Sequence, residues 1–133
     1  MAQWQSVLPS CELKPGQVKE LSWQDNDILL LRTLAGQCLA INAYCPHQGN
    51  YIPNALPPGA PLDKLLIEEE LNCPYHGWRF NGAGQCTHIP QGQRVPGIIK
   101  QGKAVMRCWQ VREENNQIQL QAEVYSTPGK TKG

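Results

Sequence analysis

The sequence predicts an all-β fold, an antiparallel sandwich or a small barrel made of short strands. Short apolar segments follow one another closely, and turns rich in glycine and proline separate them, with 12 Gly and 11 Pro among 133 residues. Several neighbouring segments are joined by turns short enough for β-hairpins. No amphipathic stretch of ten residues favours a helix. Short strands separated by turns are typical of sandwiches and barrels.

The expected strands follow in order along the chain, with three candidate hairpins among them. They cover residues 18–21, 27–34, 37–43, 65–71, 78–81, 85–89, 104–112 and 117–124. Turns at 35–36, 82–84 and 113–116 each join two consecutive segments and therefore predict hairpins. Apolar and polar residues alternate in the last segment, which predicts one buried face. That face consists of Ile118, Leu120, Ala122 and Val124.

Three stretches are expected to lie outside the strands. Residues 53–61 and 91–102 have the composition of loops, and residues 56–66 have room for one short helical turn. Residues 126–133 are polar and contain Pro and Gly, so we expect a flexible tail. The length then predicts one domain over residues 1–125.

Composition and charge exclude several classes of protein. Charged residues make up 17% and hydrophobic residues 41%, which is unlike a disordered chain. The longest aliphatic run, residues 28–31, is too short to span a membrane, so membrane insertion is not expected. The net charge of +1 argues against nucleic-acid binding. No signal peptide is recognisable, so the sequence predicts a cytoplasmic protein, whose six cysteines are metal ligands or free thiols rather than disulfides. Those expected to be small buried groups are Cys11, Cys38, Cys86 and Cys108.

Two short motifs each join a thiol to an imidazole in a loop that contains proline. One is Cys-Pro-His at residues 45–47, and the other is Cys-Pro-Tyr-His-Gly-Trp at residues 73–78. The candidate ligands are Cys45, His47, Cys73 and His76. The 25 residues between the motifs are enough for a strand pair that brings the loops face to face.

Two sulfurs and two nitrogens suit either a tetrahedral zinc ion or a binuclear iron–sulfur cluster. Zinc ligands in a pair are usually two or more residues apart, because both must reach one ion. Only one residue separates Cys45 from His47. This spacing favours the cluster, with each loop giving its thiolate to one iron and its imidazole to the other. A structural zinc site is the alternative.

The two motifs closely resemble the paired ligand boxes of Rieske [2Fe–2S] domains. The resemblance covers most of the chain, and it implies a Rieske-type antiparallel β sandwich with a small cluster-binding subdomain at about residues 44–90. It implies one [2Fe–2S] cluster as the cofactor. It also implies that Cys45 and Cys73 ligate the inner iron and that His47 and His76 ligate the outer one.

The loops are similar to those of the oxygenase and ferredoxin branch of the family. High-potential Rieske proteins carry an extra cysteine in each loop, which form a disulfide, and a serine after the glycine of the second box. The corresponding positions here are Gln48, Gly49, Asn50, Tyr75 and Trp78. We therefore expect no loop disulfide and a potential near the low end of the Rieske range, about −150 mV. The segment between the boxes is longer than usual, which predicts an inserted loop at residues 56–64.

Residues beside the ligands are expected to shape the cluster environment. Gly49 and Gly77 would let the backbone approach the cluster closely. Trp78 would shield it or belong to the core, and Tyr75 would pack beside a ligand loop or merely fill space. Gln48 follows His47 directly.

The resemblance implies one-electron transfer, and the main hypothesis is a ferredoxin-like component that passes electrons from a reductase to an oxygenase-type acceptor. The first alternative is the N-terminal Rieske domain, or a subunit, of a ring-hydroxylating-type iron oxygenase. Such an enzyme needs a second iron held by two His and one carboxylate, and only His88 remains, so a complete catalytic site is not expected in this chain. A redox sensor or a zinc-binding interaction module is an alternative of another class.

Charge is unevenly distributed along the chain. Residues 71–112 contain six basic residues and no acidic one, whereas residues 63–70 contain four acidic residues and one lysine. A basic surface near the cluster would steer an acidic redox partner. Alternatively, these charges are scattered over several solvated faces.

Overall fold

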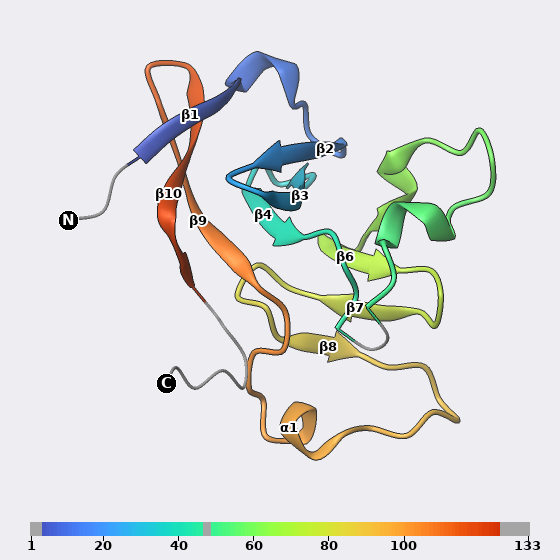
Figure 1. Cartoon of the computed structure of the whole chain (residues 1–133). Coiled ribbons are helices and arrows are strands. Elements are labelled where there is room, and N and C mark those ends of the chain that lie inside the picture. Colours follow the sequence, from blue (N-terminus) through green and yellow to red (C-terminus); the bar gives the residue numbers. More distant parts are fainter. Residues whose placement is uncertain (1–3, 47–48, 126–133) are drawn as a thin grey trace.

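The computed structural model describes residues 4–46 and 49–125, with side chains up to residue 121, and has two antiparallel sheets (Figure 1). The larger sheet has the order β1 (Trp4–Pro9), β10 (Gln117–Tyr125), β9 (Cys108–Glu114), β4 (Cys38–Asn42), β3 (Asn26–Arg32) and β2 (Val18–Trp23). The smaller sheet has the order β5 (Leu66–Ile67), β6 (Glu70–Cys73), β7 (Trp78–Phe80) and β8 (Cys86–His88). The short helices are η1 (Ser10–Glu12), η2 (Ile52–Ala55), η3 (Leu62–Leu65) and α1 (Gly97–Lys100). The all-β prediction is confirmed, and no helix among the described residues is long and apolar enough to cross a membrane.

The three predicted hairpins are present, as β3–β4, β7–β8 and β9–β10. Strand β1 and the β2–β3 hairpin were not predicted. The loop predicted at residues 91–102 contains α1, whereas η3 confirms the helical turn predicted at residues 56–66. The tail predicted at residues 126–133 lies outside the described residues.

The single strand predicted at residues 65–71 is wrong, because the chain reverses between β5 and β6. Glu68 and Glu69 occupy the turn with φ of +51° and +68°, as tight hairpins require but glutamate rarely adopts. Hydrogen bonds compensate for this conformation: the Glu69 carboxylate accepts the N–H groups of Leu34 (2.7 Å) and Ala35 (2.9 Å). The turn of the smaller sheet is thereby fixed to the β3–β4 turn of the larger one.

Strand β3 is buried on both faces, which explains its uninterrupted aliphatic run. Leu29 and Leu31 pack in the core cluster shared by the two sheets, and Ile28 and Leu30 pack on the opposite face of the larger sheet. Strands covered on both sides are expected to be apolar without alternation. The predicted face of β10 is confirmed at Ile118 and Leu120, both fully buried; the side chains of Ala122 and Val124 lie outside the described part.

The prediction that the four remaining cysteines are buried is only partly confirmed. Cys108 is buried, and burial raises the pKa of its thiol to about 12. Cys38 and Cys86 are half-buried, and Cys11 is exposed, so the prediction is wrong for Cys11. It lies in η1, a surface turn rather than a strand.

The segment predicted as an insertion joins the smaller sheet to the larger one. Within η3, the carboxylate of Asp63 accepts the backbone N–H of Val18 in β2 (2.9 Å). Nearby, the hydroxyl of Tyr51 donates to the carboxylate of Glu20, also in β2 (2.6 Å). These contacts connect η3 and Tyr51 to strand β2 of the larger sheet.

Candidate metal centre

Two loops of the same design carry the candidate ligands. We call residues 44–51 the first cluster loop and residues 73–78 the second cluster loop. In the first, the N–H of Gly49 donates to the carbonyl of Cys45 (2.7 Å); in the second, Gly77 donates to Cys73 (2.8 Å). The two glycines have φ of +74° and +77°, a region that glycine enters without steric cost. The shared Cys-Pro-x-x-Gly pattern therefore produces the same chain reversal twice.

The two loops bring their cysteines together in the interior. Cys45 is 3% exposed and Cys73 is 1% exposed. The thiol of Cys45 hydrogen-bonds to that of Cys73 and lowers the pKa of Cys73 below its usual range, despite the opposing effect of burial. The backbone N–H groups of Tyr75 and His76 also donate to the Cys73 sulfur and favour the thiolate. A pair of adjacent thiols supported by backbone donors is suited to holding one iron of a cluster.

The other predicted site residues differ in what the structure shows of them. His76 is half-buried beside Cys73, whereas His47 and Gln48 lie outside the described residues. Tyr75 is 39% exposed, so it lies at the surface of the second cluster loop rather than packed beneath it. Within the described part of the chain, no three His, Cys, Asp or Glu side chains are grouped so that they could hold one metal ion.

The second cluster loop is covered by the segment that follows β8. Trp78 is buried, and its indole Nε1 donates to Oε1 of Gln93 (2.8 Å). Nε2 of the same amide donates to the carbonyl of His76 (2.7 Å). Pro90 packs on Gly77 so closely that a Cβ atom there would lie 2.9 Å from the proline ring. Sequence reasoning missed Gln93 and Pro90, and its one available signal was that a buried indole N–H needs an acceptor.

Two tyrosines, also missed, hold the ends of the first cluster loop. Tyr44 and Tyr51 form a β-bridge, and their rings lie 5.2 Å apart. The Tyr44 hydroxyl donates to Asp27 (2.7 Å), a bond that raises the pKa of Tyr44. Burial, reinforced by the bond to Glu20, raises the pKa of Tyr51. Both phenols therefore remain neutral donors at physiological pH and attach the loop to the larger sheet.

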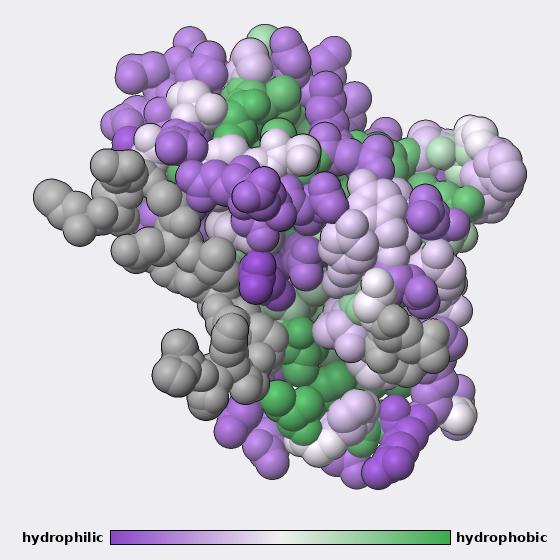
Figure 2. Space-filling view, viewed as in Figure 1, coloured by the Kyte–Doolittle hydropathy of each residue, from purple (hydrophilic) through white to green (hydrophobic). Residues whose placement is uncertain are grey.

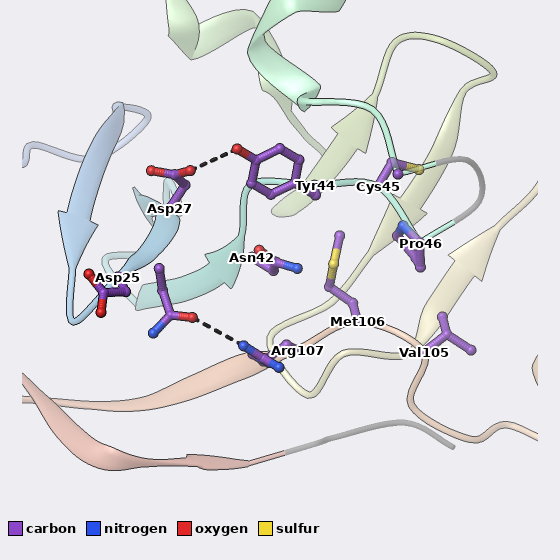
Figure 3. Close-up of a pocket in the computed structure, with 11 residues that line it drawn as sticks. Asp25, Asp27, Asn42, Tyr44, Cys45, Pro46, Val105, Met106 and Arg107 are labelled. Atoms are coloured by element: carbon purple, nitrogen blue, oxygen red, sulfur yellow. Dashed lines mark hydrogen bonds between the residues drawn. The ribbon is translucent and has the colours of Figure 1, made fainter. Parts of the chain in front are cut away.

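A cavity opens beside the first cluster loop (Figure 3). Cys45 and Pro46 form one side of it, and Met106 and Arg107 form another. Arg107 donates to the side chain of Asn26 (3.1 Å) across the cavity wall. The first cluster loop is therefore accessible from this side.

Five of the six basic residues of 71–112 fall into two groups, and the sixth is Arg107, half-buried and bonded to Asn26. Arg79 and Arg112 pair with Glu68 (3.0 Å) and Glu114 (2.9 Å). The exposed cations of the segment between β8 and β9 are Arg94, Lys100 and Lys103. We call residues 89–104 the basic segment. The face drawn in Figure 2 is mostly polar, with apolar atoms where α1 lies in Figure 1.

The fold, the paired loops and their adjacent thiols define a Rieske-type cluster-binding domain. Residues 3–101 match the Rieske [2Fe-2S] domain family, and the chain belongs to that family. One Rieske-type [2Fe–2S] cluster is its cofactor. The donor set fits this cofactor, because both thiols are buried, in contact and supported by backbone N–H groups.

The similar proteins are oxygenases and desaturases. The chain is 31% identical over 115 residues to a cholesterol 7-desaturase of Ciona intestinalis, covering 86% of this chain and 22% of that protein. It is 33% identical over 93 residues to the oxygenase component of a 3-ketosteroid-9-alpha-monooxygenase of Rhodococcus rhodochrous, covering 70% and 20%. The crystal structure of apo dicamba monooxygenase superposes with a TM-score of 0.69 and 26% identity, covering 89% of this chain and 32% of that one. The chain thus spans about a fifth of the curated relatives and a third of the solved structure.

Proposed function

We propose that this chain is the Rieske domain of an oxygenase system, which receives single electrons and passes them to a separate catalytic iron. One observation carries the proposal: most of the chain is similar to oxygenase and desaturase proteins. This supports the first alternative of the sequence analysis over a free ferredoxin. The chain has three histidines in all, and this proposal assigns two of them to the cluster. A catalytic iron that needs two further histidines is then held by residues outside these 133 positions.

In this proposal Cys45 and Cys73 hold the inner iron, and His47 and His76 hold the outer one. The contact between the two buried thiols supports the first pair. The exposed position of Tyr75 and the half-buried position of His76 support an outer iron near the surface. When bound, the cluster supplies reversible one-electron chemistry, and neutral imidazoles in place of thiolates raise its potential.

The protein's own groups tune and protect this site. Backbone N–H groups of the second cluster loop donate to the Cys73 sulfur, so they stabilise negative charge there and favour the reduced state. Trp78 and Phe80 are both buried, with ring centroids 6.5 Å apart, and they keep water from the inner side of the loop. His76 is half-buried beside the exposed Tyr75, so an electron partner can approach the site from this loop.

The basic segment supports a partner with an acidic contact surface. Its exposed cations lie on the stretch whose Pro90 and Gln93 touch the second cluster loop. Opposite charges raise association rates between proteins, and salt screens them. We expect the rate of reduction by the physiological reductase to fall as ionic strength rises. Arg94→Gln should weaken this dependence, and Arg112→Gln, paired with Glu114, is the matched control. A rate equally independent of salt in all three proteins would contradict the steering role.

Sterols are the first substrates to test for the complete system, because two of the relatives act on cholesterol and on a 3-ketosteroid according to their names. The decisive experiment distinguishes an oxygenase domain from a carrier. The reduced chain is mixed under anaerobic conditions with its catalytic polypeptide, and its oxidation is followed in the stopped-flow spectrometer. An oxygenase domain transfers its electron to a mononuclear iron within a stable complex. If the chain instead dissociates freely and reduces an oxygenase that already carries a Rieske cluster, the chain is a ferredoxin.

A further inference from the structure

Gln93 makes two short hydrogen bonds to the second cluster loop. Its Oε1 accepts the indole N–H of Trp78 (2.8 Å), and its Nε2 donates to the carbonyl of His76 (2.7 Å). From this geometry we propose that Gln93 is a positioning residue that sets the orientation of His76 at the outer iron. The inference rests on the proposed function, because it takes His76 as an iron ligand.

The two hydrogen bonds at the His76–Gly77 peptide explain how a main-chain contact can position a side chain. The carbonyl of this peptide accepts from Gln93, and its N–H, which belongs to Gly77, donates to Cys73 (2.8 Å). The peptide plane is therefore fixed at both ends. Rotation of that plane changes ψ of His76, and glycine on its other side, at φ +77°, offers little steric resistance. Loss of the bond to Gln93 leaves ψ of His76 less restrained, and the backbone that carries the imidazole is then less firmly held.

Gln93 is itself held in place by the turn to which it belongs. Its N–H donates to the carbonyl of Pro90 (3.3 Å), and Gly92 within the turn has φ of +95°. The ring of Pro90 occupies the space that a Cβ at Gly77 would need. This four-residue turn thus contacts three consecutive residues of the second cluster loop: Gly77 through a ring, and His76 and Trp78 through an amide. A side chain in a rigid turn loses less entropy when it forms its bonds, so the contact is preorganised.

Two substitutions of Gln93 distinguish its bond to the His76 carbonyl from its bond to the buried indole N–H of Trp78. Gln93→Glu keeps an acceptor for Trp78, but its ionised carboxylate has no donor for the His76 carbonyl. Gln93→Met removes both bonds at similar side-chain length. Gln85 provides a matched control, since its Oε1 accepts from Asn81 (3.0 Å) and its Nε2 donates to the carbonyl of Gly102 (2.8 Å). Gln85→Glu and Gln85→Met therefore break equivalent bonds that involve no residue of the cluster loops.

The experiment uses the cluster-loaded protein and records electron paramagnetic resonance of the reduced state, the midpoint potential and the rate of cluster loss. We expect both Gln93 variants to show altered g values and a shifted potential. Each loses the bond to the His76 carbonyl, so each should lose the cluster roughly fivefold faster, as for one ordinary hydrogen bond. Both Gln85 variants should match the parent in all three measurements. If either folded Gln93 variant keeps the parent g values and potential, Gln93 does not position His76, even if the melting temperature falls.

The parent protein distinguishes this failure from failure of the proposed function. Selective ¹⁵N labelling of histidine reports, by pulsed electron paramagnetic resonance, whether imidazole nitrogens are coupled to the cluster. A parent without such coupling overturns the ligand assignment and the positioning role together. A parent with the coupling, and Gln93 variants identical to it, overturns the positioning role alone. Far-UV circular dichroism confirms that each variant is folded before these comparisons are made.

Discussion

Replacing Gly77 by alanine tests how tightly the segment after β8 packs on the second cluster loop. Gly77 has φ of +77°, and an added Cβ would lie 2.9 Å from a ring carbon of Pro90. Gly49 occupies the equivalent place in the first cluster loop with φ of +74°, but no described atom lies within 4 Å of an added Cβ. The two glycines share the same backbone requirement, and only Gly77 has the close neighbour.

The expected loss of unfolding free energy has two contributions, the backbone conformation and the contact with the Pro90 ring. A non-glycine residue in the left-handed region costs about 1 to 2 kcal/mol, which applies to both substitutions. Overpacking against a rigid ring adds about 1 to 3 kcal/mol, which applies to Gly77→Ala alone. We therefore expect Gly49→Ala to lower the unfolding free energy by about 1 to 2 kcal/mol and Gly77→Ala by about 2 to 5 kcal/mol. For a domain of this size, 1 kcal/mol corresponds to about 4 °C in melting temperature.

The assay is thermal unfolding of the cluster-loaded proteins under anaerobic conditions, followed by far-UV circular dichroism. Adding Pro90→Ala to Gly77→Ala should restore about 1 kcal/mol or more of the loss, because it removes the ring carbon that the new methyl group meets. Adding Pro90→Ala to Gly49→Ala should restore nothing. Equal losses for Gly77→Ala and Gly49→Ala, or no recovery in the double variant, would show that the ring does not press on the loop.

Three further predictions concern a link between the two sheets, an ion pair of the larger sheet and the cluster itself. Glu69→Gln removes one of the two acceptor oxygens that bind Leu34 and Ala35, so the melting temperature should fall by an amount equivalent to about 1 kcal/mol; an unchanged value would contradict the proposed link between the turns. Arg32 lowers the pKa of Glu113 by a direct hydrogen bond, so its stabilisation is complete above the ordinary carboxyl pKa of about 4.3 and is lost as pH falls through the lowered pKa. Urea unfolding between pH 6 and pH 3, as an experimental range, should give a shallower acid slope for Glu113→Gln, and equal slopes would refute this account. Removal of the iron should make the buried thiols of Cys45 and Cys73 reactive toward a thiol reagent and should lower the melting temperature. A protein unaffected by iron removal would contradict a structural contribution of the cluster.

Local signals in the sequence were enough for much of the fold and for the cluster loops. Gly-containing turns predicted the β3–β4 and β7–β8 hairpins, and apolar alternation predicted the buried face of β10 at Ile118 and Leu120. The two Cys-Pro motifs predicted loops that meet, and the structure places Cys45 against Cys73. In each case the information lies within a few neighbouring residues.

Contacts between distant segments were beyond the reach of such patterns. The Glu68–Glu69 turn lacks turn-forming residues, and it depends on main-chain donors more than 30 positions away. The sequence placed Asp63 in an inserted loop of unknown role, because its partner Val18 is 45 residues away. Gln93 lies in a stretch with the composition of a surface loop, yet it bonds to two residues of the second cluster loop. These residues connect surfaces that only the folded chain brings together.

Electron paramagnetic resonance of the freshly isolated, dithionite-reduced protein tests most directly whether two thiolates and two imidazoles share one binuclear cluster. The account predicts a signal whose average g value lies below that of an all-cysteine [2Fe–2S] ferredoxin recorded alongside. A spectrum with the average g value of the all-cysteine protein, or no signal from protein isolated with care to exclude oxygen, would contradict it.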